Sequence, residues 1–221
     1  MFEAHFQSFT ESADPSHGKA RLASLRKELK AQGLDGFIVP RADEQQNEYV
    51  PAHAERLSWL TGFTGSAGTA IILLKKAAVF VDGRYTLQVG EQIDVKIFTP
   101  VALADFSPET WLERHVTKGA LIGYDPALHT RAQVRRLAVA VERNGAELIA
   151  VKRNPLDAVW ADRPQAPLAP ICLHPKKFAG EEATKKIARI EKSLSGVAGL
   201  LLSDPHSVAW AFNIRGNDVA H

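Results

Sequence analysis

The sequence predicts an α/β fold in which a mixed sheet is flanked by helices. Three observations support this fold class. Helical stretches with one apolar face alternate with short apolar strands, two β-rich runs lie so close together that they form a hairpin, and the composition is ordinary for a globular protein. The 221 residues are 45% hydrophobic and 24% charged, with 15 Gly and 12 Pro, which excludes collagen, coiled coil and disulfide-rich scaffolds.

The charge balance and the single cysteine limit the class of protein further. The chain has 27 Lys and Arg against 25 Asp and Glu, a net charge of +2, which is too small to indicate nucleic-acid binding. Cys172 has no companion, so no internal disulfide forms and a reducing compartment is expected. No secretory signal is visible, and no apolar run approaches the roughly 20 residues that span a bilayer. We therefore expect a cytoplasmic protein that does not contact membranes.

The first part of the chain predicts a helix, a strand and a second, short helix. Leu22, Leu25 and Leu29 share one helical face, and Gly33 is a natural residue to follow a helix end. Pro40 ends the next apolar run. In order, we expect a loose leader at residues 1–17, a helix at 19–32, a strand at 36–39, a polar loop at 41–52 and a short helix at 53–60.

A hairpin and two helix–strand pairs follow. Residues 69–74 and 77–81 are β-rich and are separated only by Lys75 and Lys76, so we expect them to pair as a hairpin. Pro108 lies at the start of residues 108–115, which favours a helix there. The expected elements after the hairpin are a helix at 84–91, a strand at 95–98, a helix at 108–115 and a strand at 121–124 that ends at Asp125.

The strongest local signal in the sequence lies at residues 130–143. Thr130 and Gln133 have the spacing of a capping box, and an apolar stripe runs along one face behind them. Asn144 and Gly145 end this helix, and residues 147–151 form the next expected strand. A hairpin followed by alternating helices and strands gives a mixed sheet with helices packed against it.

Composition shifts after residue 153. Five prolines favour an extended linker, so we expect a domain at 18–153, a linker at 154–179 and the start of a second domain at 180–221. The second part should contain a helix from about residue 180, a strand at 198–202 and a helix at 207–212. Ile187, Ile190 and Leu194 line one face of the first of these helices, and we expect Lys185, Lys186, Arg189 and Lys192 to be its solvated side.

The order of elements in residues 180–216 repeats that of residues 19–62, with Trp59 and Trp210 in matching places. A single strand cannot satisfy its own backbone hydrogen bonds. We therefore expect the second domain to continue beyond these 221 residues. The four tryptophans are expected in core or interface packing: Trp59, Trp111, Trp160 and Trp210.

Residues 62–69 are the most glycine-dense segment. They lack the Lys-Ser/Thr of a phosphate-binding P-loop and precede a strand rather than a helix. Ser66 is not at the centre of a Gly-x-Ser-x-Gly motif, so it does not have the spacing of a nucleophile elbow. We interpret the segment as a conformationally demanding loop that leads into the hairpin.

Asp82 and Arg84 follow a buried strand, and the sequence allows two interpretations. The two side chains can pair across the turn, which the residues alone favour. Alternatively, Arg84 lies in a cleft, where its fork of donors holds a carboxylate or a peptide carbonyl. Asp82 and Asp125 raise a further hypothesis, since carboxylates at the ends of neighbouring strands can hold Mg²⁺ for phosphodiester cleavage, although Asp also ends strands for turn reasons.

No complete metal site is expected in this chain, because no set of ligands has suitable spacing. Asp218 and His221 form an i, i+3 pair without partners, and Cys172 has no second cysteine. The histidines show no His-Glu-x-x-His or similar pattern: His5, His17, His53, His115, His129, His174, His206 and His221.

Five motifs, in order, carry a resemblance to a known family. They are Asn-Glu-Tyr-Val at 47–50, Thr-Gly-Phe-Thr-Gly-Ser-Ala-Gly-Thr-Ala at 61–70, Asp-Gly-Arg-Tyr at 82–85, Val-Trp-Ala-Asp-Arg-Pro at 159–164, and Ala-Trp-Ala-Phe-Asn-Ile-Arg-Gly-Asn-Asp-Val at 209–219. With these motifs the chain resembles the N-terminal part of the cytosolic-type Xaa-Pro aminopeptidases, in the creatinase/prolidase-related family of peptidases.

The resemblance implies two related N-terminal α/β domains, the first with a creatinase-like, ribonuclease H-like fold, ahead of a C-terminal metallopeptidase domain. The family removes an N-terminal residue when proline is second, using two divalent ions, usually manganese, whose Asp, His and Glu ligands lie in the C-terminal domain. None of that domain is present here. The resemblance therefore assigns no metal ligand and no catalytic residue to this chain, which alone should be inactive.

One residue role carries over from the family. The arginine of Asp-Gly-Arg-Tyr helps bind the peptide and matches Arg84. The implied partners are a peptide with proline second, the protein's own C-terminal domain and further copies of itself in a homo-oligomer such as a dimer. Two alternatives from other classes are a stand-alone protein-binding module of the same fold and a ribonuclease H-like, metal-dependent nuclease using Asp82 and Asp125.

Overall fold

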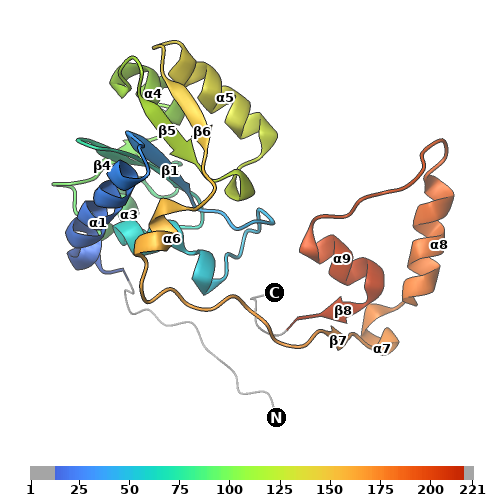
Figure 1. The fold of residues 1–221 in the computed structure, drawn as a ribbon. Coiled ribbons are helices and arrows are strands. Elements are labelled where there is room, and N and C mark those ends of the chain that lie inside the picture. The colour runs from blue at the N-terminus through green and yellow to red at the C-terminus, as the bar shows by residue number, and fades with distance from the viewer. Residues whose placement is uncertain (1–12, 217–221) are drawn as a thin grey trace. The chain divides into compact units, whose positions relative to one another are not determined.

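The computed structural model describes residues 13–216, which fall into two compact units. The first unit contains residues 13–41, 56–125 and 130–161, and the second contains residues 42–55, 126–129 and 162–216. Figure 1 traces both along the chain. Residues 1–12 of the predicted leader, as well as Asp218 and His221, lie outside the described residues.

The first unit is built on a six-stranded sheet, which confirms the predicted mixed α/β fold. The strands are β1 (Gly36–Pro40), β2 (Thr69–Leu73), β3 (Ala77–Val81), β4 (Thr99–Ala102), β5 (Leu121–Tyr124) and β6 (Glu147–Ala150). Their order across the sheet is β4-β3-β2-β1-β5-β6. The central pairs β1–β2 and β2–β3 are antiparallel, whereas β3–β4, β1–β5 and β5–β6 are parallel.

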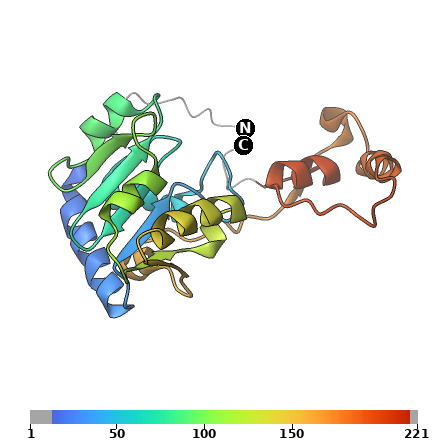
Figure 2. The same cartoon turned by 90° about the horizontal axis from the view of Figure 1, so that it is seen from above.

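Helices cover both faces of this sheet and bury a core on each (Figure 2). Side chains of β3 alternate between the cores, with Val79 in one and Phe80 in the other, because successive strand residues point to opposite faces. One core packs on α1 (Gly18–Ala31), α2 (Arg56–Thr61), α3 (Thr86–Gln92) and α6 (Pro155–Val159); the other packs on α4 (Pro108–His115) and α5 (Arg131–Glu142).

The predicted capping box and the predicted hairpin are both confirmed. Thr130 and Gln133 form the predicted capping box at the start of α5, with the Thr130 amide donating to Gln133 Oε1 at 2.7 Å. The hairpin of β2 and β3 turns at Lys75 and Lys76, where the Leu73 amide donates to the Lys76 carbonyl. These elements depend on local rules, since a cap and a short connection need only neighbouring residues.

The strand predicted at residues 95–98 is wrong, because the strand β4 begins at Thr99. Asp94 turns the chain instead. Its side chain accepts a hydrogen bond from the Lys96 amide, and its carbonyl accepts hydrogen bonds from the amides of Ile97 and Phe98. The aspartate thus offers the backbone a local alternative to the sheet, and this competes with the β-propensity of the apolar residues that follow.

The segment predicted to be an extended linker from residue 154 begins instead with the helix α6. Asn154 caps it by accepting hydrogen bonds from the amides of Leu156 and Asp157, and Pro155 occupies its first turn. Leu156 and Trp160 are buried in the core of the first unit. The chain leaves regular structure only after this helix, at residues 161–171.

The second unit contains the short antiparallel strands β7 (Cys172–Leu173) and β8 (Ile214–Arg215). Its α-helices are α7 (Lys176–Ala179), α8 (Ala183–Ser193) and α9 (Pro205–Phe212), and α8 packs against α9. Short 3-10 turns occur in both units, at Pro15–His17 in the first and at Ala52–Ala54 and Pro126–Leu128 in the second. The helices confirm the predicted order of helical segments in this part of the chain.

Two predictions for the second unit are wrong. Residues 198–202 form no strand, and among the described residues of this unit only β7 and β8 pair, so an isolated apolar run finds no neighbour to hydrogen-bond. Lys186 is not solvated but only 3% exposed. Its ammonium donates to the Trp210 carbonyl at 3.0 Å and to Asn213 Oδ1 at 2.7 Å, and it lies 4.6 Å from the centre of the Trp210 ring.

Candidate functional site

Loops of the first unit converge at the edge of the sheet where β3 ends and β2 begins. Thr69 of β2 lies opposite Phe80 of β3 in the antiparallel pair, so the loop at residues 62–68 and the turn at residues 82–85 are neighbours. β1 ends at the same edge, where the Arg41 amide donates to the Gly68 carbonyl. The two motifs that the sequence singled out separately therefore form one site.

The loop at residues 62–68 is conformationally demanding, as predicted. Gly62 has a φ of +90°, and a Cβ there would lie 2.6 Å from the Gln92 carbonyl oxygen. A Cβ on Gly65 would overlap the ring of Phe63, which is fully buried. Glycine is required at these two positions for backbone and packing reasons, and the loop closes tightly over Phe63.

Ser66 and Tyr85 join this loop to the turn after β3. The Ser66 hydroxyl and the Tyr85 hydroxyl are hydrogen-bonded at 2.7 Å. That hydrogen bond is the main reason why the pKa of Tyr85 lies below its ordinary value. The Tyr85 ring also meets the Phe63 ring edge to face, with centroids 5.6 Å apart, which is a favourable aromatic geometry.

Arg84 pairs with Asp82 through a planar fork of hydrogen bonds. Arg84 Nε donates to Asp82 Oδ1 at 3.0 Å, and Nη2 donates to Oδ2 at 2.8 Å. These bonds, with one from the Arg84 amide, hold the pKa of Asp82 below its usual range. The Arg84 side chain is nevertheless 61% exposed. The pairing predicted from the sequence is therefore confirmed, and it leaves the guanidinium at the surface.

The Arg84 guanidinium also lies over the Tyr85 ring, 4.9 Å from its centre. We call the four residues Ser66, Asp82, Arg84 and Tyr85 the Arg84 cluster. It presents a guanidinium at the surface, held by a carboxylate on one edge and an aromatic ring on one face. Such a group can receive a carboxylate or a carbonyl from a ligand.

The hypothesis that Asp82 and Asp125 lie at the ends of neighbouring strands is wrong. Asp82 follows β3 and Asp125 follows β5, and two strands, β2 and β1, lie between them. Three steps of about 4.8 Å separate these strand ends by roughly 14 Å. Asp125 instead accepts a hydrogen bond from the Asn154 side chain at 2.9 Å. The geometry removes the basis for a nuclease that uses these two carboxylates on one ion.

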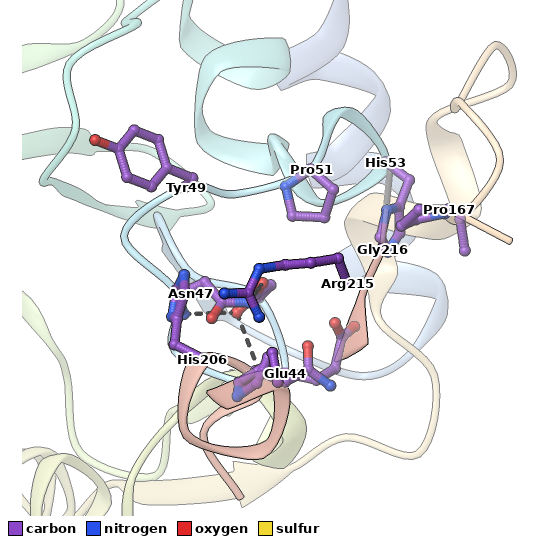
Figure 3. A pocket seen from close by; sticks show the side chains of 14 residues that line it. Glu44, Asn47, Tyr49, Pro51, His53, Pro167, His206, Arg215 and Gly216 are labelled. Carbon is purple, nitrogen blue, oxygen red and sulfur yellow. Dashed lines mark hydrogen bonds between the residues drawn. The ribbon is translucent and has the colours of Figure 1, made fainter. Parts of the chain in front are cut away.

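The second unit has a pocket of about 570 Å³ that sequence reasoning missed (Figure 3). Asp43, which is 1% exposed, shapes the loop that forms one wall by accepting hydrogen bonds from the amides of Gln45 and Asn47 and from the Asn47 side chain. The sequence signal that could have found this pocket lies in two of the five ordered motifs, since residues 47–50 and 209–219 both contribute to its lining.

Charged and apolar side chains share this pocket. Arg215 extends across it, with Pro51 on one side and Glu44 and His206 on the other (Figure 3). Tyr49 and Pro167 add to the apolar lining. A carboxylate, a guanidinium and an apolar wall can contact both polar and apolar parts of a ligand.

Residues 13–216 contain no group of three His, Cys, Asp or Glu side chains that could hold a metal ion. None of the helices in this range is long and apolar enough to cross a bilayer.

Tryptophans lie as expected in the first unit, where Trp111 and Trp160 are buried and Trp59 stacks on Trp160, whereas Trp210 in the second unit is 46% exposed.

Two protein-family models match the chain. The model of the creatinase/prolidase N-terminal domain matches residues 21–158, and a second model with the same description matches residues 162–221. The first match ends at residue 158, within α6, and the second begins at residue 162, which agrees with the position of that helix in the first unit.

Curated relatives match almost the whole chain. It is 34% identical over 224 residues to a probable Xaa-Pro aminopeptidase P of Coccidioides posadasii, covering 99% of this chain and 34% of the relative. It is 37% identical over 226 residues to the corresponding protein of Aspergillus fumigatus, covering 100% and 35%. The chain therefore spans about a third of the length of these relatives.

One solved structure supports the fold. The X-prolyl aminopeptidase of Caenorhabditis elegans, described as a cytosolic enzyme with a di-nuclear active site, aligns with 91% of this chain and 35% of its own. The TM-score is 0.83 at 24% sequence identity.

Proposed function

The chain belongs to the creatinase/prolidase N-terminal domain family, and from this premise we propose that it is the non-catalytic N-terminal part of an Xaa-Pro aminopeptidase. The whole enzyme would remove the N-terminal residue from peptides that have proline in second position. The observation that carries this proposal is the match of nearly the entire chain to proteins named Xaa-Pro aminopeptidase P, of which it covers about a third.

The catalytic chemistry is assigned to the remainder of the enzyme. There, two divalent ions, for which we propose manganese, would activate a water molecule and polarise the scissile carbonyl. The described residues of this chain do not fit such a centre, since their side chains do not gather three metal-ligating groups. The role that we assign to this chain is binding and orientation of the peptide and control of access to the site.

Arg84 is the residue to which we assign peptide binding. The side chain stands at the sheet edge and is 61% exposed, so a peptide carbonyl or carboxylate can reach it. An arginine keeps its charge at every physiological pH and offers donors in a fixed plane. Proline in a peptide removes one backbone donor, which increases the value of recognition through the remaining carbonyl oxygens.

The domain organisation remains a proposal. Residues 18–153 would form the first domain, and residues 180–221 would begin a second creatinase-like domain. The helix α6 packs into the first unit, so the linker proposed for 154–179 would start near residue 161. Large apolar side chains of the second unit are exposed and would be covered by the rest of that domain: Leu168, Ile171, Leu173, Phe178, Val197, Leu200, Leu201, Trp210 and Phe212.

We also propose a cytoplasmic location and self-association into a homo-oligomer for the whole enzyme. Neighbouring N-terminal domains would then limit the length of peptide that enters. Gel filtration with light scattering of the complete protein tests the assembly, and a monomer at micromolar concentration would contradict it.

The central experiment compares the complete protein with residues 1–221 alone, both with Mn²⁺ supplied, on a peptide with proline second and on a matched peptide with alanine second. We expect the complete protein to release the N-terminal residue of the first peptide only and the 221-residue chain to be inactive. Turnover by the short chain would overturn the proposal. A reading frame that stops after His221 in the native gene would favour a stand-alone binding module instead.

A further inference from the structure

A surface arginine is usually mobile, and Arg84 is constrained in an unusual way. Its side chain is long and mostly exposed, so holding it in one place for a ligand costs conformational entropy at the moment of binding. Two neighbours restrict it in advance. Asp82 holds two nitrogen atoms in the plane of the guanidinium, and Tyr85 covers one face of that plane.

Both restraints begin in the turn after β3, and Tyr85 has a second support in the loop at residues 62–68. Asp82 is placed by the turn after β3. In this turn its Oδ1 accepts a hydrogen bond from the Arg84 amide, and its carbonyl accepts one from the Tyr85 amide. Tyr85 is also placed by the loop at residues 62–68, which we call the glycine-rich loop. The contacts are the hydrogen bond with Ser66 and the edge-to-face contact with Phe63. The loop therefore reaches the guanidinium through one aromatic ring.

We propose that Asp82 and Tyr85 are positioning residues for Arg84, and that Ser66 acts at one further remove by fixing Tyr85. They hold the guanidinium over the sheet edge in the orientation in which it receives the peptide. This inference rests on the function proposed for Arg84. It adds that the glycine-rich loop and the turn at residues 82–85 work as one preorganised binding element.

Stability alone does not account for the arrangement. The Arg84–Asp82 pair is at the surface, with side chains 61% and 34% exposed, and exposed ion pairs contribute little to folding. The glycine-rich loop, by contrast, is already fixed from below by Phe63. The hydrogen bond between the hydroxyls of Ser66 and Tyr85 thus has its main consequence at the Arg84 guanidinium.

The test measures KM and kcat of the complete enzyme for Arg84→Ala, Asp82→Asn and Tyr85→Leu. We expect Arg84→Ala to raise KM about tenfold, as for loss of a charged hydrogen bond. Asp82→Asn and Tyr85→Leu should each raise KM about two- to fivefold, as for an exposed pair, with kcat little changed. Tyr85→Phe, which keeps the ring, should fall between wild type and Tyr85→Leu.

The double variant separates positioning from a general structural effect. In an Arg84→Ala background, Asp82→Asn should raise KM no further, because its target is gone. Asp94→Asn is the matched control. The Asp94 side chain also accepts a hydrogen bond from the amide two residues later, but that residue is Lys96 rather than an arginine. The KM of Asp94→Asn should equal that of wild type. The melting temperature of each variant identifies any variant that is unfolded. If Tyr85→Leu is unfolded, Asp82→Asn still tests the proposal, because Asp82 lies in a surface turn.

The outcomes distinguish the two proposals. If Arg84→Ala leaves KM and kcat unchanged, the proposed role of Arg84 is wrong. If Arg84→Ala raises KM while Asp82→Asn does not, only the positioning inference is wrong. A fall in KM for Asp82→Asn would also overturn it, since the carboxylate would then compete with the ligand for the guanidinium.

Discussion

Arg56 donates two hydrogen bonds to the carboxylate of Asp157, at 2.8 Å from Nε and 3.0 Å from Nη2. The Arg56 side chain is 3% exposed and that of Asp157 is 22% exposed. The pair joins α2 to α6 across 101 positions of sequence. It fixes α6, and with it the end of the first unit, to the body of the fold.

The first prediction follows from the burial of this pair. Asp157→Ala leaves the Arg56 guanidinium buried without its carboxylate, and breaking a buried pair from one side costs about 3–5 kcal/mol. We expect the free energy of unfolding, measured by urea denaturation, to fall by about 3 kcal/mol, toward the low end because Asp157 is partly exposed.

A matched control is Glu109→Ala, which removes the partner of Arg136 in an exposed pair. That change should cost less than about 1 kcal/mol. Equal losses for the two variants would show that burial does not set the strength of the Arg56–Asp157 pair.

The position of α6 could not be predicted from local sequence. Pro155 and the prolines that follow favour an extended linker, yet Pro in the first turn is also compatible with a helix. What decides is tertiary: Leu156 fills a place in the core and Asp157 meets Arg56. Composition identifies proline-rich segments but does not reveal such distant partners.

The second prediction concerns Lys186, whose ammonium is bound at the end of α9. Lys186→Met keeps most of the apolar stem but removes the donors to the Trp210 carbonyl and Asn213 Oδ1. Losing a charged donor to buried acceptors costs about 1–3 kcal/mol. Amide hydrogen exchange in α9 should quicken by about tenfold or more.

Lys185→Met is the control for this change, because Lys185 is the exposed neighbour on the same helix. It should leave exchange in α9 unaltered. If both variants behave alike, Lys186 is not the residue that stabilises the helix end.

Lys186 also marks a limit of sequence-based reasoning about helical faces. The apolar positions Ile187 and Ile190 correctly predict a helix here, and charged residues between them favour a solvated side. A lysine one position before an apolar face can nevertheless bury its stem and satisfy its ammonium on carbonyl groups. No periodicity reveals the two acceptors at the end of α9, the Trp210 carbonyl and Asn213 Oδ1.

The third prediction concerns the pH behaviour of Asp82. The hydrogen bonds from Arg84 lower the pKa of Asp82 in the folded protein. A carboxyl with a lowered folded pKa contributes stability above its unfolded pKa, and this contribution is lost as pH falls through the folded value. In carboxyl carbon NMR of the 221-residue chain, Asp82 should titrate at lower pH in wild type than in Arg84→Ala.

An Asp82 pKa that is identical in wild type and Arg84→Ala would mean that the fork of hydrogen bonds does not persist in solution. The positioning of Arg84 would then lose its geometric basis.

Much of the Arg84 cluster could be predicted from sequence, but its connections could not. The motifs at residues 62–69 and 82–85 stand out by composition, and both lie at the ends of predicted strands. Their contact depends on the antiparallel register of β2 and β3, which places Thr69 opposite Phe80. The hydrogen bond between Ser66 and Tyr85 spans 19 positions and has no signature in either motif.

The last prediction tests the coupling of the glycine-rich loop to the cluster. A methyl group added by Gly65→Ala would overlap the Phe63 ring, which is buried. Overpacking a core position costs about 1–3 kcal/mol, and any shift of Phe63 displaces Tyr85, whose ring meets it edge to face. We therefore expect both a lower melting temperature and a higher KM in the complete enzyme.

Gly83→Ala is the control, since a Cβ there meets no atom within 4 Å, and it should change neither the melting temperature nor KM. Because Gly83 lies next to Arg84 and Gly65 does not, an effect at Gly65 alone would show that the aromatic contact, rather than proximity in sequence, transmits the change to the guanidinium; an effect at Gly83 alone would contradict that route.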